Sequence, residues 1–181
     1  GRDRDDSGAP AAAPDGFLGG RLSVLQPPDH ARASIDAVFL AAAVPARAGE
    51  RALELGSGAG VASRCLAWRV PGLAVEGREL QAHIAALARQ SASLNRLDDR
   101  VRFTAGALRQ GPVCGGGIHH VLMNQPYYEA RTTRPSPVPG RALAHAEVAG
   151  GLADWVRAGL NALQPRGTLT VIHRAERQGA L

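Results

Sequence analysis

The sequence contains no lysine, so all 21 of its basic residues are arginine. It has only two cysteines, Cys65 and Cys114, which match no paired-thiol metal spacing and are too few for a disulfide framework. No apolar run reaches the roughly 18–20 residues that span a bilayer, and the N-terminus lacks the apolar core of a secretory signal. These absences argue against a membrane protein and predict a reducing, cytoplasmic setting.

The composition is that of a soluble globular protein, since 45% of the 181 residues are apolar and 20% are charged. This length favours one domain with a full core. We expect a disordered, Ala/Pro-rich leader over residues 1–16 and a single domain over residues 17–181. The net charge of +5 invites a polyanionic partner. The arginine bias is also typical of a GC-rich genome, so the charge alone does not decide whether nucleic acid binds.

Strand-like and helix-like segments alternate through the middle of the chain. A short strand or a hairpin is expected in residues 17–26, and a helix capped by Ser34 or Asp36 follows it. Alternating strands and amphipathic helices predict right-handed βαβ units and a doubly wound, mostly parallel α/β sheet. The predicted strands are 52–55, 73–75, 101–103, 120–123 and 168–172, and the predicted apolar helix positions are Val61, Cys65 and Trp68, then Ile84, Leu87, Ala88, Ser91 and Leu94, then Val148, Leu152, Trp155, Val156, Gly159 and Leu163.

The first predicted strand of this sheet runs into a glycine-rich loop, Gly56-Ser57-Gly58-Ala59-Gly60, which opens a helix. Glycines there let the backbone approach a ligand, with the helix N-terminus directed at it. The G-x-G-x-G spacing differs from the G-x-G-x-x-G of dinucleotide folds. A tight turn without a ligand is the alternative interpretation.

An acidic residue follows the second strand. A carboxylate in the position of Glu79 accepts hydrogen bonds from both ribose hydroxyls of a nucleoside. Glu76 is a rival by spacing, but Glu79 comes after the strand and is followed by Leu80, whose side chain can pack on an adenine. The loop and this acid together indicate a nucleoside-containing cofactor without a pyrophosphate.

The fourth predicted strand ends at a segment suited to a planar amino group, Asn124-Gln125-Pro126-Tyr127-Tyr128. The Asn124 side-chain oxygen and the Gln125 carbonyl can both accept hydrogen bonds from one –NH₂ group, and Pro126 fixes the turn. Tyr127 offers a face on which a flipped base can stack, worth roughly 1–3 kcal/mol. A polar turn with two half-buried tyrosines is the alternative.

These motifs resemble those of a known family. Glu54 to Gly60 resembles motif I of class I S-adenosylmethionine-dependent methyltransferases, and Asn124 to Tyr127 resembles their Asn-Pro-Pro-Tyr motif for amino-group methylation. Together with Ile35 to Val38 and Gly77 to Gln81, they resemble the tRNA adenine-N6 methyltransferases that act beside the anticodon of a valine tRNA. The resemblance covers about Phe17 to Arg174.

The resemblance implies a Rossmann-like methyltransferase fold, S-adenosyl-L-methionine as cofactor and tRNA as partner. Asn124, Pro126 and Tyr127 would be the catalytic residues. Arg131 and Arg134, in a basic Pro-rich loop, suit phosphate contacts. The implied cofactor-binding residues are Glu54, Gly56, Ser57, Gly58, Glu79, Leu80, Ala107 and Asn124, and the implied substrate-binding residues are Gln125, Tyr127, Tyr128, Arg131 and Arg134.

The sequence departs from the family pattern in three places. Gln125 replaces the first proline, and Ala107 stands where the family usually has an acid that bonds the adenine amino group. Loss of that bond costs about 1.5–3 kcal/mol, or roughly tenfold to a hundredfold in affinity. The chain also stops after its fifth predicted strand, whereas the family sheet has seven. We therefore expect this chain to leave a strand edge exposed at residues 168–172. Missing strands, a second copy or another partner would cover that edge.

Two other functions stay open. Protein-glutamine methyltransferases carry similar Asn-Pro-Pro-Tyr motifs, although they usually have a helical domain before motif I, where this chain has only about 50 residues. A degenerate methyltransferase fold, kept as an RNA-binding or scaffold module, would explain Ala107 and Gln125. The six histidines share no metal-ligand spacing, and Cys65 and Trp155 are expected in the core.

Overall fold

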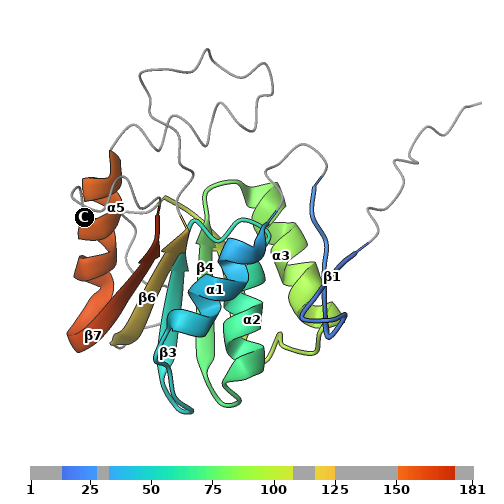
Figure 1. Cartoon of the computed structure of the whole chain (residues 1–181). Helices are drawn as coiled ribbons and strands as arrows, with labels where there is room; N and C mark the ends of the chain where they lie inside the picture. The colour runs from blue at the N-terminus through green and yellow to red at the C-terminus, as the bar shows by residue number, and fades with distance from the viewer. Residues whose placement is uncertain (1–13, 28–32, 108–116, 125–150, 174–181) are drawn as a thin grey trace, which may run out of the picture.

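The computed structural model describes residues 14–27, 33–107, 117–124 and 151–173. Their centre is a five-stranded parallel sheet in the order β5-β4-β3-β6-β7 (Figure 1). The strands are β3 (Arg51–Leu55), β4 (Ala74–Glu79), β5 (Val101–Ala105), β6 (Ile118–Asn124) and β7 (Leu163–Ile172). The predicted doubly wound, parallel α/β sheet is confirmed.

The strand order reverses at β3. The chain first moves outward from β3 to β4 and β5, then returns to β6, which pairs with the other side of β3. The register pairs Leu55 with Arg78 on β4 and with Met123 on β6. Ligands of open α/β sheets bind at the carboxyl ends of the strands where such a reversal occurs.

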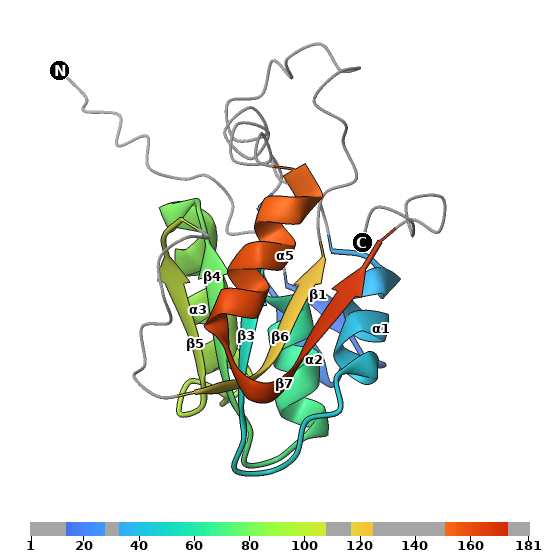
Figure 2. The ribbon, with the colours of Figure 1, turned by 90° about the vertical axis from the view of Figure 1, so that its left-hand side faces the viewer.

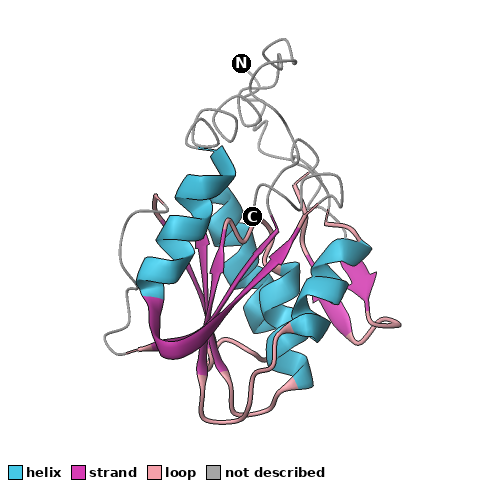
Figure 3. Cartoon of the chain, turned by 60° about the vertical axis from the view of Figure 1, so that its left-hand side comes forward, coloured by secondary structure: helices cyan, strands magenta, loops and turns pink. Residues whose placement is uncertain are grey.

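Helices cover both faces of the sheet (Figures 2 and 3). On one face, α1 (Ile35–Ala43), α2 (Val61–Arg69) and α3 (Ala82–Leu94) enclose the larger core cluster. On the other, α5 (Gly151–Ala162) packs through Trp155 on β3 and β6. Ser34 caps α1 as expected, because its hydroxyl accepts a hydrogen bond from the backbone N–H of Asp36 at 3.3 Å.

Two expected core positions and one expected helix position were wrong. Trp68 is 43% exposed and Leu94 is 57% exposed, and each lies in the last turn of its helix. Leu163, expected in the last helix, begins β7 and pairs with Ile118. The Pro165–Gly167 segment, expected as a turn, is instead an irregular part of this strand, where Arg166 has a φ of 67°.

The predicted N-terminal hairpin is confirmed as β1 (Asp15–Phe17) and β2 (Leu22–Val24). Asn95 at the end of α3 attaches it to the domain, since its side chain bonds both the N–H and the carbonyl of Ser23. Strand β1 begins at Asp15, inside the expected leader, because the Asp15 carboxylate accepts a bond from Gln26 at 2.6 Å. Residues 1–13 lie outside the described part.

A buried histidine, His120, links neighbouring segments at the amino end of the sheet. The His120 ring nitrogens lie 2.7 Å from the Thr168 hydroxyl and 2.8 Å from the Glu50 carboxylate. The hydrogen bond to His120 lowers the pKa of Glu50. This histidine therefore joins β6 to β7 and has a structural role.

Strand β7 lies at one edge of the described sheet, and its residues are half-buried or exposed. The expectation that a partner covers this edge stays a prediction. None of the helices in the described ranges has the length and apolar character needed to cross a membrane.

Candidate functional site

The residues predicted to bind ligand come together at the carboxyl edge of the sheet. The glycine loop follows β3, Glu79 ends β4, Ala107 lies just beyond β5 and Asn124 ends β6. Parallel strands place these ends on one side of the domain, as the arrowheads in Figure 1 show. The first half of the sheet thus contributes the loop and the acid, and the second half contributes the asparagine.

The loop requires glycine at three positions. Gly56, Gly58 and Gly60 have φ values of 66°, 52° and 73°, which L side chains rarely adopt. A Cβ at Gly56 would also lie 2.6 Å from the Trp155 ring. Gly60 is the N-cap of α2 and supplies no capping side chain. The loop is therefore a backbone surface that opens on a helix N-terminus, as expected for a ligand cradle.

Glu79 contacts this loop directly. One of its carboxylate oxygens accepts a bond from the Gly58 N–H at 2.9 Å, and the other accepts from the Gln81 N–H at 3.0 Å. Each oxygen keeps a second lone pair, which suits the two hydroxyls of a ribose. Its sequence rival Glu76 lies inside β4, where it forms a 3.1 Å ion pair with Arg78. Geometry therefore favours Glu79 at this edge.

Glu54 points into the protein instead of toward open space. Its carboxylate accepts bonds from both the N–H and the hydroxyl of Ser63, in the first turn of α2. Burial raises the pKa of Glu54 to about 7, although the bonds from Ser63 and the charge of Arg64 act in the opposite direction. The resemblance implied that Glu54 surrounds the cofactor. In this geometry Glu54 stabilises the first turn of α2, the helix that follows the glycine loop.

The remaining positions predicted to bind the cofactor, Ser57, Leu80 and Ala107, differ in their polar groups and burial. The Ser57 N–H donates to the Arg78 carbonyl at 2.9 Å, while its buried hydroxyl has no hydrogen-bond partner. Leu80 is half-buried directly after Glu79. Ala107 is also half-buried and has only a methyl group, and the expected loss of one bond to an adenine amino group stays a prediction.

Asn124 lies next to the glycine loop. Met123 pairs with Leu55, the last residue of β3, so Asn124 is one residue beyond this pair and level with Gly56. Asn124 itself pairs with Ile172 and is half-buried. The other acceptor-side residues, Gln125, Pro126, Tyr127, Tyr128, Arg131 and Arg134, lie outside the described part of the chain.

Sequence reasoning missed two residues beneath the loop. The Arg64 side chain is fully buried and donates to the carbonyls of Ala59 and Ala88. Burial lowers its pKa to about 10. The guanidinium carbon lies 5.4 Å from the centre of the Phe103 ring, which is also buried. No pattern distinguished Arg64 from a surface arginine, because an isolated arginine on a helix is usually exposed.

Part of the basic excess consists of arginines that bond backbone carbonyls, of which Arg64 is buried, Arg100 is half-buried, and Arg69 and Arg89 are exposed. Arg100, for example, bonds the Ala67 carbonyl near the C-terminus of α2, where a positive charge also complements the helix dipole. The net charge is therefore a poor guide to a nucleic-acid surface.

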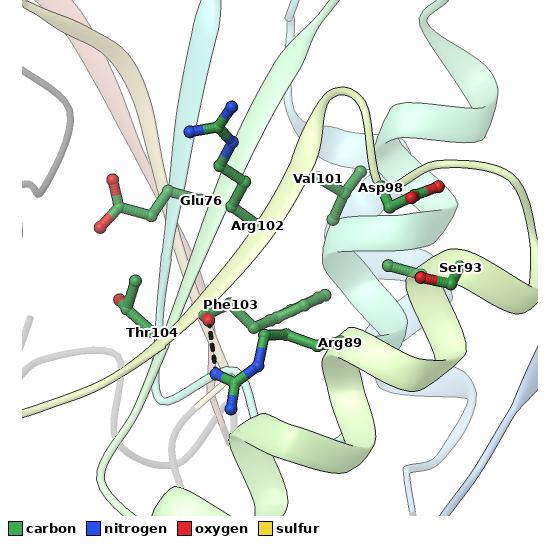
Figure 4. A pocket seen from close by; sticks show the side chains of 9 residues that line it. Glu76, Arg89, Ser93, Asp98, Val101, Arg102, Phe103 and Thr104 are labelled. Carbon is green, nitrogen blue, oxygen red and sulfur yellow. Dashed lines mark hydrogen bonds between the residues drawn. The ribbon is translucent and has the colours of Figure 1, made fainter.

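A groove of about 390 Å³ lies along the outer side of β5 (Figure 4). Arg89 from α3 enters it and donates to the Phe103 carbonyl at 2.9 Å, so a polar group of the strand edge is already bonded. Arg102, Glu76 and Asp98 give the lining mixed charge. The groove is not part of the carboxyl-edge site. Within the described ranges, no group of three or more His, Cys, Asp or Glu residues could hold a metal ion.

The sheet order and the loop after β3 define the Rossmann-like fold of S-adenosylmethionine-dependent methyltransferases. Among similar solved structures, TrmN from Thermus thermophilus has a TM-score of 0.56 at 24% identity, over 75% of this chain and 36% of that chain. Protein Atu636 from Agrobacterium tumefaciens, a predicted O-methyltransferase, has a TM-score of 0.61 at 24% identity, over 80% and 64%.

A further similar structure is a methyltransferase from Geobacter sulfurreducens in complex with S-adenosyl-L-homocysteine. Its TM-score is 0.56 at 22% identity, over 76% of this chain and 47% of that chain. The matches thus cover between about one third and two thirds of these longer chains. No protein-family model and no curated protein matches the sequence.

Proposed function

We propose that this chain is an S-adenosylmethionine-dependent N-methyltransferase that acts on the exocyclic N6 of adenine in tRNA. The observation that carries the proposal is the pairing of Leu55 with Met123, which brings Asn124 beside the glycine loop. A group that accepts hydrogen bonds from an amine thus lies next to a loop suited to a nucleoside cofactor. The resemblance of Asn124 to Tyr127 to the amino-methylating motif supplies the acceptor class.

The residues of the first half fit the cofactor. The backbone of Gly56 and Gly58 would hold its methionine part, and Glu79 would accept hydrogen bonds from the ribose. Leu80 would pack on the adenine. The buried, unpartnered hydroxyl of Ser57 is a further polar group in this loop. When bound, S-adenosylmethionine supplies an electrophilic methyl group on its sulfonium.

The residues of the second half would orient the acceptor. The Asn124 side-chain oxygen and the Gln125 carbonyl would accept the two hydrogens of one amino group, drawing the nitrogen toward tetrahedral geometry and directing its lone pair at the methyl group. No strong base is needed, because the nitrogen becomes positively charged and acidic as it attacks. Tyr127 would stack on the flipped base, with Tyr128 beside it, while Arg131 and Arg134 would contact phosphates. The proposed setting is the cytoplasm.

The test is transfer of a labelled methyl group from S-adenosylmethionine to unmodified bulk tRNA. The wild-type chain should label the RNA, and nucleoside digestion should yield N6-methyladenosine. Asn124→Ala should remove the label. Labelling of added protein instead of RNA would favour the protein-glutamine alternative.

A catalytically degenerate binding module is the second candidate, and Ala107 is the observation that favours it. Without an acceptor for the adenine amino group, the cofactor site lacks one charged hydrogen bond. This candidate predicts binding of S-adenosylmethionine that is only millimolar or absent. Micromolar binding measured by titration calorimetry would contradict it.

A further inference from the structure

A buried cation lies directly beneath the glycine loop. Arg64 projects from α2, and its guanidinium bonds the carbonyl of Ala59 in the loop and, at 3.0 Å, the carbonyl of Ala88 in α3. Ala59 lies between two glycines with positive φ, so its neighbours restrict its peptide planes only weakly. The bond from Arg64 therefore fixes a carbonyl orientation that the local sequence leaves free.

Phe103 supports the loop from β5. A Cβ added at Gly60 or at Gly77 would collide with its ring, so the ring fills the space that these two glycines leave open. The same added Cβ at Gly60 would lie 3.1 Å from a guanidinium nitrogen of Arg64. The ring and the guanidinium thus meet under one residue of the loop, at the distance of a cation–π contact.

We propose that Arg64 and Phe103 are positioning residues that hold the glycine loop in the shape required by the amino-acid part of the cofactor. The proposal rests on the proposed function, and it concerns only the methionine end of the ligand. Glu79, which would hold the nucleoside end, is attached to β4 and Gln81 as well as to the loop. Loosening the loop should therefore weaken one end of the ligand much more than the other.

The structure gives a reason to separate this role from simple stability. A buried guanidinium costs desolvation free energy, and well-packed apolar residues often replace buried ionic groups without loss of stability. One N–H of Arg64, on Nε, has no hydrogen-bond partner, which adds to that cost. Retaining such a group under a ligand-binding loop is understandable when the loop needs a fixed carbonyl.

The experiment compares two ligands on Arg64→Met. S-adenosylhomocysteine carries the amino-acid part, whereas 5′-methylthioadenosine keeps the nucleoside and lacks that part. We expect the dissociation constant for S-adenosylhomocysteine to rise about tenfold or more, while that for 5′-methylthioadenosine changes less than twofold. Phe103→Leu should act in the same direction with a smaller effect.

Arg100→Met is the matched control. Like Arg64, Arg100 donates to two backbone carbonyls, but these belong to Ala67 and to the C-cap residue Val70, at the end of α2 far from the loop. It should leave both dissociation constants unchanged even where it lowers the unfolding temperature. Amide hydrogen exchange in the ligand-free chain adds a second readout, in which residues 57–60 should exchange faster in Arg64→Met and not in Arg100→Met.

Two results would overturn the positioning role alone. One is that Arg64→Met weakens the binding of both ligands equally. The other is that it changes neither the dissociation constants nor the amide hydrogen exchange of residues 57–60. If Arg64→Met does not fold, Phe103→Leu decides by the same two-ligand ratio. A wild-type chain that binds neither ligand would overturn the proposed function, and the positioning role with it.

Discussion

The two halves of the sheet organise the carboxyl edge in different ways. In the first half, residues 51–107, buried polar groups connect the strand ends with the loop and helices, as Glu54 does with Ser63 and Glu79 does with Gly58. Among the described residues of the second half, 117–124 and 151–173, His120 is the only buried polar side chain, and the core is apolar. In the first half, the polar groups at the carboxyl edge are thus bonded to one another, whereas the second half presents one polar residue, Asn124, at its edge.

This difference matches a division of labour in which one half binds the cofactor and the other selects the acceptor. The similar structures include proteins described as O-methyltransferases as well as TrmN. Under the proposed function, the residues that begin at Asn124 would select the acceptor atom.

Asn124→Ala should give the largest effect and separate the two halves most sharply. We expect methyl transfer to fall at least about a hundredfold, because the amine loses a hydrogen-bond acceptor that would orient it. The affinity for S-adenosylhomocysteine should stay within twofold. Single-turnover transfer and calorimetry measure the two quantities, and full transfer activity would refute the role of Asn124.

Gly56→Ala should destabilise the first half, because the added methyl group would collide with Trp155 of α5, which packs on the other face of the sheet. The backbone at this position would also hold alanine at a left-handed φ. Together, the collision and this strain should lower the unfolding free energy by about 2–4 kcal/mol. Gly49→Ala is the control, since its φ is 84° but nothing lies within 4 Å of the added Cβ. It should cost only about 1 kcal/mol. Urea unfolding measures both, and equal losses would argue against the Trp155 contact.

Glu54 should make the first half sensitive to pH. Its pKa rises from 4.5 in the unfolded chain to about 7 in the fold, because burial disfavours the carboxylate. Between these values the folded state keeps a proton that the unfolded state has lost, so the unfolding free energy should fall as the pH rises, by on the order of 3 kcal/mol in total.

Glu54→Gln isolates this effect, because the amide stays neutral. Urea unfolding at pH 5, 6, 7 and 8 should show a flatter profile for the variant than for the wild type. Parallel profiles would contradict the buried, protonated state of Glu54.

Glu79→Gln tests the acid that contacts the loop. Removing the charge should weaken S-adenosylhomocysteine about tenfold, because the ribose hydroxyls lose a carboxylate acceptor. Glu76→Gln is the control, since it breaks the ion pair with Arg78 inside β4 without touching the loop. It should lower the unfolding temperature and leave affinity unchanged. An equal loss of affinity in both variants would remove the special role of Glu79.

Arg134→Ala should have the smallest effect and concern the acceptor side only. We expect weaker tRNA binding with a salt slope reduced by about one, and no change in cofactor affinity. Arg100→Ala removes an arginine that already bonds backbone carbonyls, so it should leave the salt slope unchanged. Filter binding at several salt concentrations measures the slope. An unchanged slope in Arg134→Ala would count against a phosphate contact.

The sequence by itself determined the alternation of strands and helices, the glycine loop and the order of the candidate site along the chain, because these depend on local periodicity and on backbone conformations that only glycine adopts easily. Ser34 as a cap and Cys65 as a core residue follow from the same local rules. The sequence did not predict exposure at the helix ends: Trp68 fits the apolar period of α2, yet in the last turn of that helix its side chain is 43% exposed.

Only the tertiary structure decided what the polar residues do. It turned Glu54 inward onto α2 and buried Arg64 under the loop, because each role depends on strands that are adjacent in space and distant in sequence. The sequence already favoured Glu79 over Glu76, and the tertiary structure added the contact of Glu79 with the Gly58 N–H. A count of charged residues cannot show that an arginine donates its hydrogen bonds to backbone carbonyls. Pairing across the sheet, which joins β3 to β6, is what brings Asn124 to the loop, and no local pattern contains that contact.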